Sequence, residues 1–261
     1  GLRPLEATRR QGVPVVFTNH TSGFLQRLER GDRARRRVGA RLTHLAMVLA
    51  PSEELAEATR QVGYAGRVEF ISNGVDPRRF HPEGREAARA RFEIEAHDVV
   101  VLLARRLVPK NGVRYFAEAA SEFDHPSLRI LIAGDGPERG AMEPFIDALN
   151  VPARHQFLGS VPNDAMPELY RAADISVLPS LQEATSITGL ESMATGLPLV
   201  GTRVGGIPAI VDPSRNGVLV SARDPKGLGQ AVRALIDDAP RRLRLGAGGR
   251  ERVEREFSWL A

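Results

Sequence analysis

The chain has 261 residues, 42% of them hydrophobic, and a formal net charge of +4 at pH 7. This length exceeds one typical domain, and no apolar run approaches the roughly 18 residues that a membrane span needs, so we expect two packed lobes and no transmembrane helix. The absence of cysteine excludes disulfides, thiolate metal sites and thiol nucleophiles, and makes the cytoplasm the expected location.

The first 75 residues have the pattern of an incomplete α/β lobe. Three short apolar runs predict strands, and stretches with helical periodicity follow the first two. The expected strands are 13–18, 45–50 and 67–71, with helix-like stretches at about 22–45 and a helix at 52–61. Three strands are too few to close a lobe, and the first residue is not methionine, so we expect a fragment of a longer protein.

An arginine-rich run, RGDRARRRVGAR at residues 30–41, lies within the first of these helices. Such a run can bind nucleic acid or an anionic membrane surface. It has no interleaved aromatic residues, however, and a solvated helix face explains it equally well. We therefore expect no nucleic-acid partner, and we leave open a peripheral contact at the inner face of a membrane.

A regular alternation of strands and helices begins at residue 98, after an irregular joint at 73–84 that contains Asn-Gly and two prolines. The alternation predicts an α/β lobe with a doubly wound, Rossmann-like parallel sheet at residues 76–261. The expected strands are 99–104, 128–133, 153–158, 174–179, 197–202 and 217–220. Helices are expected at 113–123, 137–149, 164–172, 187–195, 206–211, 225–237 and 240–256.

The loop after the first strand of this lobe has the composition of a phosphate site. Ligands of doubly wound sheets bind outside the carboxyl ends of the strands. Here the sequence ARRLVPKNG places Arg105, Arg106 and Lys110 just before a helix. Fixed cations and the free N–H groups of a helix N-terminus neutralise a diphosphate together, so the loop predicts a diphosphate site. Solvent-facing basic residues are the alternative interpretation.

The loop after the second strand, GDGPE, contains Gly134 and Gly136. Glycine allows a tight turn and a close approach of ligand to backbone, which makes Gly134 a candidate binding residue, although G-x-G pairs are also common in ordinary strand-to-helix turns. The third glycine of the dinucleotide fingerprint is missing, which argues against an NAD site.

The stretch QEATSITGLESMATG, residues 182–196, carries Glu183 and Glu191 around a predicted helix start. Between them, Ser186, Ile187 and Thr188 would expose N–H groups where the helix dipole stabilises an anion. A carboxylate can accept hydrogen bonds from two vicinal hydroxyls. Two surface glutamates are the usual explanation of this spacing, but the neighbouring loops favour a sugar-nucleotide site, with one carboxylate for the ribose and one for the transferred sugar.

Several linked motifs resemble a known family. They are RLVPKNG, IAGDGPE, FLGSVPNDAMPELYRAADISVLPS, QEATSITGLESMATG, ATGLPLVGTRVGGIPAIV and NGVLV, with TNHTS and SNGVDPRRF upstream. In this order, over residues 67–258, they are similar to the carboxyl-terminal donor lobe of GT-B glycosyltransferases of the retaining family 4. Residues 1–75 would then be part of the acceptor-side lobe, and residues 76–261 would be the lobe that binds the nucleotide sugar.

The resemblance implies roles for individual residues. The family usually has the pattern R-L-x-x-x-K-G, whereas here Lys110 falls one place early and Asn111 occupies the lysine position. Arg105 with Lys110 restores the usual spacing, so the choice between Arg105 and Arg106 stays open. The implied roles are diphosphate contact for Arg106 and Lys110, ribose binding for Glu191, catalytic contact with the donor sugar for Glu183 and His20, and phosphate and sugar contacts for Ser186, Ile187 and Thr188.

His20 and the question of a metal need separate treatment. A lone histidine after a strand often has a purely structural hydrogen bond, and only the TNHTS context raises the catalytic interpretation to an equal footing. No D-x-D motif and no histidine pair suggests a required metal. We therefore expect no cofactor, with the nucleotide-diphosphate sugar as substrate.

The expected activity is that of a bacterial, cytoplasmic, retaining glycosyltransferase of the hexosyltransferase type. It would move a sugar from the nucleotide-diphosphate donor to an acceptor hydroxyl without a metal. Two alternatives stay open: a GT-B-like sugar-nucleotide epimerase, which needs no acceptor, and a donor-binding fragment without catalytic activity. The sequence does not define the donor base, the donor sugar or the acceptor, which could be a sugar, a lipid or a small molecule.

Overall fold

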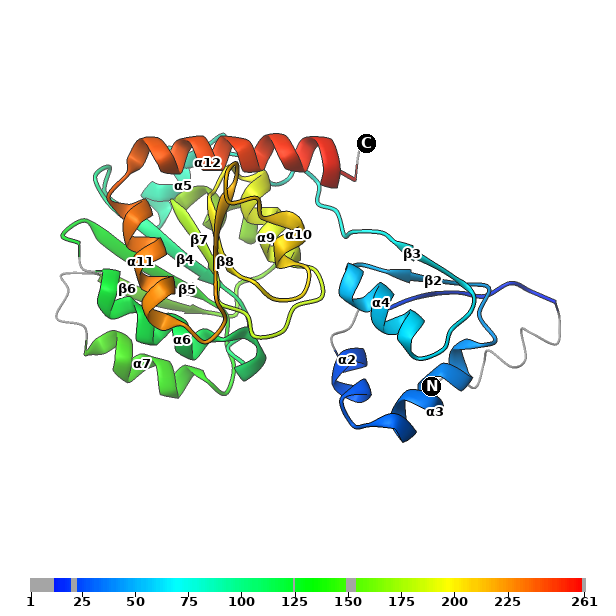
Figure 1. Cartoon of the computed structure of the whole chain (residues 1–261). Coiled ribbons are helices and arrows are strands. Elements are labelled where there is room, and N and C mark those ends of the chain that lie inside the picture. Colours follow the sequence, from blue (N-terminus) through cyan, green and yellow to red (C-terminus); the bar gives the residue numbers. More distant parts are fainter. Residues whose placement is uncertain (1–11, 20–22, 124, 149–153, 260–261) are drawn as a thin grey trace. The chain divides into compact units, whose positions relative to one another are not determined.

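The structure is a computed structural model that describes residues 12–19, 23–123, 125–148 and 154–259 (Figure 1). The chain forms two compact units. The first comprises Gly1–Asn73 with Glu183–Thr185, and the second comprises Gly74–Gln182 with Ser186–Ala261. The sequence predicts a boundary after residue 75, and no pattern in it indicates that residues 183–185 group with the first unit.

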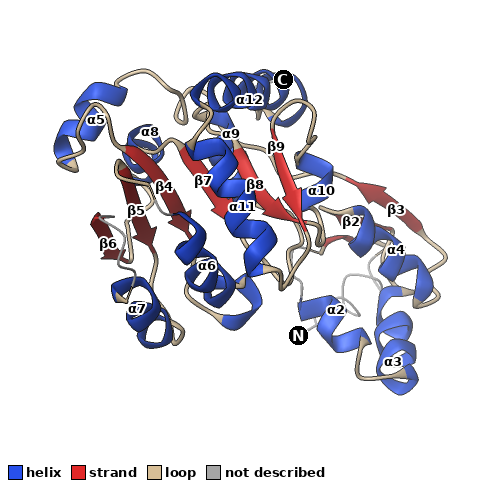
Figure 2. Ribbon diagram, turned by 60° about the vertical axis from the view of Figure 1, so that its left-hand side comes forward, coloured by secondary structure: helices blue, strands red, loops and turns tan. Residues whose placement is uncertain are grey.

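The second unit is built on a six-stranded sheet in which all neighbouring strands are parallel. The spatial order is β6-β5-β4-β7-β8-β9 (Figure 2). The strands are β4 (Val99–Ala104), β5 (Leu128–Ala133), β6 (Arg154–Gly159), β7 (Ile175–Leu178), β8 (Leu199–Thr202) and β9 (Gly217–Val220). Each of the six expected runs forms a strand, so the predicted doubly wound parallel sheet is confirmed.

Helices cover both faces of this sheet (Figures 1 and 2). Every residue of β4 is buried: Val100 and Leu102 pack in a cluster with α8 and α9, whereas Val101 and Leu103 pack with α6 and α11. A strand buried on both faces needs a continuous apolar run, which VVVLLA provides. The helices are α5 (Arg85–Arg91), α6 (Val113–Ala119), α7 (Arg139–Asp147), α8 (Met166–Ala172), α9 (Ile187–Ala194), α10 (Ile207–Ile210), α11 (Pro225–Ile236) and α12 (Ala239–Arg252).

The first unit has a three-stranded parallel sheet in the order β1-β2-β3. Its elements are β1 (Val16–Thr18), α2 (Gly23–Leu28), α3 (Asp32–Leu42), β2 (Met47–Ala50), α4 (Glu53–Gln61) and β3 (Arg67–Phe70). The buried Tyr64 hydroxyl donates to the Leu45 carbonyl at 3.1 Å. Ala184 joins an apolar cluster of β2 and α4, and the Thr185 hydroxyl donates to the Pro51 carbonyl. These contacts explain why residues 183–185 belong to this unit.

The helix-like stretches expected at about 22–45 form α2 and α3, which are separated at Gly31, with φ of 100°. One helical segment differs from the expectation. Helix α5 was not predicted at all. It is short and is held by ion pairs rather than by an apolar stripe: Arg85 and Arg89 bind the Asp174 carboxylate at 2.7 and 3.1 Å. Such long-range pairs leave no periodicity in the local sequence.

The end of the chain binds the joint that begins the second unit. Helix α12 continues as one π-helical turn (Val253–Phe257). The Val75 N–H then donates to the Phe257 carbonyl at 2.9 Å, and the Trp259 N–H donates to the Val75 carbonyl at 3.1 Å. Arg250 donates to the Phe80 carbonyl at 2.7 Å. The joint is therefore fixed to the second unit from residue 75 onward.

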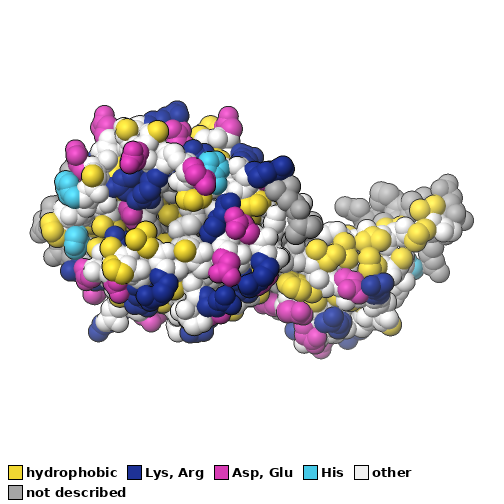
Figure 3. Space-filling view, turned by 90° about the horizontal axis from the view of Figure 1, so that it is seen from above, with side chains coloured by type: hydrophobic (Ala, Val, Ile, Leu, Met, Phe, Trp, Pro, Cys, Tyr) yellow, Lys and Arg dark blue, Asp and Glu magenta, His cyan; other side chains and the backbone are white. Residues whose placement is uncertain are grey.

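The surface of the second unit in Figure 3 carries basic and acidic side chains that are interspersed rather than gathered in one patch. On α12 and the turn that follows it, Arg250 pairs with Glu254 at 2.6 Å and Arg252 pairs with Glu256 at 2.9 Å. Pairs one turn apart stabilise an exposed helix. No described helix is both long and apolar enough to cross a membrane.

Gly112 allows two loops at one edge of the six-stranded sheet to pack closely. Its φ of 65° lies in the left-handed region, and it directly precedes α6. A Cβ atom at this position would lie 1.8 Å from the carbonyl oxygen of Pro179, in the loop after β7. Both the backbone angle and the close contact therefore require glycine.

We expect Gly112→Ala to lower the free energy of unfolding by about 1–3 kcal/mol or more, since it strains the backbone and displaces the Pro179 loop. Gly140→Ala is the matched control, because Gly140 lies in α7 and has open space around its Cβ position. Alanine there should raise stability by up to about 1 kcal/mol. Urea unfolding followed by circular dichroism measures both variants, and equal midpoints would show that the loop contact does not need glycine.

Candidate functional site

The loops after β4 and β7 leave the sheet where its strand order reverses. From β4 the chain proceeds to β5 and β6 on one side, and from β7 it proceeds to β8 and β9 on the other. In doubly wound sheets, ligands bind at such a reversal, in the crevice outside the carboxyl ends of the two adjacent strands. The two loops are hydrogen-bonded to each other, because the N–H groups of Leu181 and Gln182 donate to the Lys110 carbonyl at 2.9 and 3.1 Å.

Arg105 is held across this crevice by side chains from both loops. Its guanidinium donates to Ser180 Oγ at 2.7 Å and to Asn111 Oδ1 at 3.2 Å. Asn111 is only 5% exposed, and its Nδ2 donates to the Arg106 carbonyl at 2.8 Å. Of the two arginines between which the sequence left the choice open, Arg105 is therefore half-buried and oriented, whereas the side chain of Arg106 is exposed, as is that of Lys110.

Gly134 brings the loop after β5 against the loop after β4. Its φ is 144°, and a Cβ atom would lie 1.8 Å from the Arg105 carbonyl oxygen. The N–H of Leu107 also donates to the Asp135 carbonyl at 2.9 Å. The tight turn expected from GDGPE is confirmed, and its observed effect is to support the backbone that carries Arg105.

The start of α9 presents backbone N–H groups at the end of the loop that follows β7. Ser186 is buried, and its Oγ accepts from the Gly189 N–H at 3.1 Å, so the side chain expected to contact a ligand instead caps the helix. Ile187 and Thr188 are the first two residues of α9, and their N–H groups have no acceptor within the helix. The positive end of the helix dipole therefore lies here.

Glu191 is half-buried in α9 and is oriented by a buried tyrosine. The Tyr170 hydroxyl donates to Glu191 Oε2 at 3.0 Å. Burial raises the pKa of Glu191, and this outweighs the opposing effects of the Tyr170 hydrogen bond and the positive charge of Arg79. Burial, followed by the Glu191 charge, raises the pKa of Tyr170 well above its usual range, so the hydroxyl keeps its proton as a donor. Among the described residues, Glu191 Oε1 has no hydrogen-bond partner.

One of the expected residues belongs to the other unit, and a second lies outside the described residues. Glu183 is half-buried and groups with the first unit, whereas Glu191 belongs to the second, so the idea that the two carboxylates share one ligand stays a prediction. His20 lies outside the described residues. Within the described ranges, no group of three or more histidine, aspartate and glutamate side chains could hold a metal ion.

Three polar residues of the site were not anticipated as part of it. Ser180 and Asn111 orient Arg105, and Tyr170 orients Glu191. One feature of the sequence drew attention to Asn111: it occupies the position at which the family pattern has lysine. Tyr170 had none, since it lies in α8, twenty-one positions before its partner, and looks like an ordinary core aromatic.

Solved structures place this fold in the GT-B class. Sucrose-phosphate synthase from Thermosynechococcus elongatus is 26% identical and matches with a TM-score of 0.85, over 98% of this chain and 67% of that protein. The Anabaena protein HepE, solved with UDP and glucose, matches with a TM-score of 0.83 at 21% identity, over 99% of this chain and 72% of that protein. Both agree with the parallel sheets and flanking helices described above.

Sequence relatives define the family. Residues 84–252 match the family model of the glycosyl transferases group 1, and residues 2–79 match that of glycosyltransferase family 4. The chain therefore belongs to the group 1 glycosyltransferases. Similar curated proteins are D-inositol 3-phosphate glycosyltransferases of Corynebacterium efficiens, 32% identical over 95% of this chain, and of Salinispora tropica, 33% identical over 97%. The chain spans 63% and 58% of the lengths of these two relatives.

We expect Glu191→Gln to remove part of the pH dependence of stability. Because the folded-state pKa of Glu191 is raised above its usual 4.5, the folded protein binds this proton more tightly than the unfolded chain. The resulting stabilisation is complete below pH 4.5 and is lost as the pH rises through the folded-state pKa. Glutamine cannot ionise, so the variant should gain stability relative to the unmodified protein between acidic and neutral pH. Urea midpoints at several pH values test this, and a constant difference would contradict it.

Asn111→Ala should lower the free energy of unfolding by about 1–3 kcal/mol, because the part-buried Arg106 carbonyl and the Arg105 guanidinium each lose a partner. Asn163→Ala is the control, since Asn163 is exposed and only its backbone carbonyl accepts a hydrogen bond, from Arg79. The control should unfold within about 0.5 kcal/mol of the unmodified chain. Equal urea midpoints for both variants would rule out a supporting role for Asn111.

Proposed function

We propose that the protein transfers a sugar from a nucleotide-diphosphate donor to an acceptor hydroxyl, with retention of anomeric configuration and without a metal. The observation that carries this proposal is the Arg105 guanidinium, which Ser180 and Asn111 hold at the reversal of strand order. Membership of the group 1 glycosyltransferases and the UDP-glucose complex of the Anabaena protein HepE support it. Because the chain spans only part of its relatives' length, the proposal concerns the whole protein.

Charge on the leaving diphosphate is the main chemical requirement of the reaction. As the bond to the anomeric carbon breaks, negative charge grows on the diphosphate. Arg105, Arg106 and Lys110 would neutralise it, together with the N–H groups at the start of α9. We propose that Arg105 supplies the charge that a lysine at position 111 supplies elsewhere in the family, since its guanidinium contacts the Asn111 side chain directly.

The carboxylates would bind the two sugar rings. Glu191 would accept hydrogen bonds from the ribose hydroxyls through Oε1, because Tyr170 already occupies Oε2. Glu183 would stabilise the oxocarbenium-like donor sugar electrostatically rather than as a covalent nucleophile, and His20 would contact the same sugar from the first lobe. The names of the relatives suggest a polyol phosphate, of the inositol phosphate type, as the acceptor.

Donor binding without transfer is the second candidate for the chain itself. One observation favours it: the chain spans 63% and 58% of the lengths of two relatives that are named as glycosyltransferases. The two candidates differ in products. Incubation with UDP-glucose and with other nucleotide sugars, with and without D-inositol 3-phosphate, distinguishes them, and conversion of the donor without acceptor would instead indicate an epimerase. Full activity in EDTA and a retained anomeric coupling in the NMR spectrum of the product are expected for the transferase.

We expect Arg105→Gln to weaken UDP binding at least about tenfold, since a charge-assisted contact with the diphosphate is lost. Adding Asn111→Lys to this variant should restore much of the affinity, because lysine returns a cation to the same place. Arg114→Gln is the control, since Arg114 is exposed on α6 and pairs with Glu118 at 2.7 Å. Calorimetric titration with UDP measures all three. Unchanged binding in Arg105→Gln, or a double variant no better than the single one, would overturn the assignment of Arg105.

A further inference from the structure

Arg79 lies in the joint that begins the second unit, and it contacts the loop that follows β6. Its guanidinium donates to the Asn163 carbonyl at 2.5 Å, across 84 positions of the chain. Because all strands of the six-stranded sheet are parallel, this loop leaves the sheet at the same edge as the loops after β4 and β7. The joint therefore helps to fix a loop at the edge where the donor is proposed to bind.

Aromatic contacts connect Arg79 to the tyrosine that orients Glu191. The Arg79 guanidinium lies over the Phe80 ring, 5.3 Å from its centroid. The Phe80 ring packs edge-to-face against the Tyr170 ring, with 5.9 Å between the centroids, and both rings are buried. The Tyr170 hydroxyl in turn donates to Glu191 Oε2. The segment that carries Arg79 is thus packed against the part of the second unit that holds Glu191.

The charge of Arg79 is not neutralised by a neighbouring carboxylate. Arg79 lines an open groove together with Asp164 and Glu168. Glu168 pairs with Arg91 at 2.6 Å, and Arg79 forms no ion pair with any acidic residue that the structure describes. An exposed guanidinium without a carboxylate partner leaves its full charge to act on more distant groups.

Glu191 is one of these groups. Burial raises its pKa most, whereas the Tyr170 hydrogen bond and then the charge of Arg79 lower that pKa. The strands β7 and β8 and helix α10, which pack against α9, contain no titratable side chain. The charged residues on the other elements that pack against α9 are Glu168 and Arg171 of α8, Arg250 of α12, and Glu254, Arg255 and Glu256 of the π-helical turn. Arg79 is the cation that favours the ionised form of Glu191.

We propose that Arg79 is a positioning residue of the donor site, which fixes the loop after β6 to the joint and provides the positive charge that acts on the ribose-binding carboxylate of Glu191. The inference rests on the proposed function, which assigns Glu191 to the ribose. An ionised carboxylate accepts hydrogen bonds through both oxygens, whereas a protonated one has a donor in place of an acceptor. Arg79 therefore acts on ribose binding without contacting the nucleotide.

This role predicts that Arg79 distinguishes a ligand with a ribose from one without it. Calorimetric titration of the 261-residue chain with UDP and with pyrophosphate tests this. At about pH 6 we expect Arg79→Gln to weaken UDP binding about threefold or more, and to change pyrophosphate binding less than about twofold. The loss for UDP should become smaller toward about pH 8, because the Glu191 carboxyl group ionises there in both proteins.

Arg78→Gln is the matched control. Arg78 is also exposed and directly precedes Arg79, but its Nε lies 3.6 Å from Asp76 Oδ1. The change of charge is the same, so UDP affinity should stay within about twofold of the unmodified chain at every pH. The comparison is made at each pH separately, because the terminal phosphate of UDP itself titrates near about pH 6.

Two further variants separate the proposed role from a purely structural one. Arg79→Lys keeps the positive charge and should restore most of the UDP affinity at the lower pH. In the double variant Arg79→Gln with Glu191→Gln, the carboxylate on which Arg79 acts is missing, so the second substitution should remove most of the pH dependence of the loss. Urea unfolding of the same variants shows whether the second unit stays folded.

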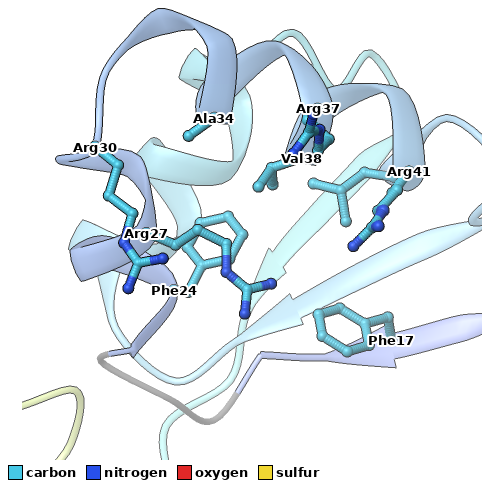
Figure 4. A pocket seen from close by; sticks show the side chains of 9 residues that line it. Phe17, Phe24, Arg27, Arg30, Ala34, Arg37, Val38 and Arg41 are labelled. Carbon is cyan, nitrogen blue, oxygen red and sulfur yellow. The ribbon is translucent and has the colours of Figure 1, made fainter. Parts of the chain in front are cut away.

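A basic hollow in the first unit also has the charge to bind a diphosphate. It has a volume of about 420 Å³ and is formed by β1, α2 and α3 (Figure 4). Its lining includes Phe17, Phe24, Arg27, Arg30, Arg37 and Arg41. The arginine run at 30–41 therefore lies partly on this hollow and not only on a solvated helix face. Arg41→Gln measures the contribution of the hollow, and it should leave the difference between Arg79→Gln and Arg78→Gln unchanged.

Three results would overturn the inference. They are equal UDP affinity of Arg79→Gln and Arg78→Gln at every pH, equal weakening of UDP and pyrophosphate by Arg79→Gln, and a loss in Arg79→Gln that does not depend on pH. Each of them leaves UDP binding by the unmodified chain intact, so the proposed function would stand. Failure of the unmodified chain to bind UDP at all would instead contradict the proposed function, and the assignment of Arg79 with it.

Discussion

The chain winds from β4 in one direction and from β7 in the other, and the site depends on the hydrogen bonds that join the loops after these two adjacent strands. Lys110 accepts from the opposite loop through its carbonyl, and Arg105 reaches Ser180 with its side chain. Gly112 and Gly134 then allow the neighbouring loops to pack directly against these backbones. The topology brings the loops after β4 and β7 to the same edge of the sheet, and these few polar contacts fix their positions.

The charged groups of the site are stabilised in opposite ways. The Arg105 guanidinium donates to two neutral oxygens, the Ser180 hydroxyl and the Asn111 side-chain amide. The Glu191 carboxylate accepts one hydrogen bond, from the Tyr170 hydroxyl, and burial raises its pKa. A carboxylate with unsatisfied acceptor capacity is costly in the free protein, and it gains most from a ligand that brings hydroxyl donors.

The sequence was sufficient for the sheet and for the edge at which the site lies, because both follow from local patterns. Apolar runs predicted all six strands of the second unit, and the glycine-rich and basic loops lay at the ends of those strands. Sequence reasoning failed where a residue acts through a distant partner. Helix α5 is held by ion pairs to Asp174, and the Glu191 carboxylate is oriented by the Tyr170 hydroxyl. Ser186 caps α9, because its Oγ accepts from the Gly189 N–H.

The attachment of the chain's end to Val75 has a mechanical consequence. Two backbone hydrogen bonds of Val75 and the contacts of Arg250 fix the segment that begins at Val75 to the second unit. Any pivoting of one body against the other must then be absorbed at the three covalent crossings that remain outside this brace, just before Gly74 and on either side of residues 183–185. Glu183 stands directly at one of these crossings, so such a motion would carry that carboxylate with it.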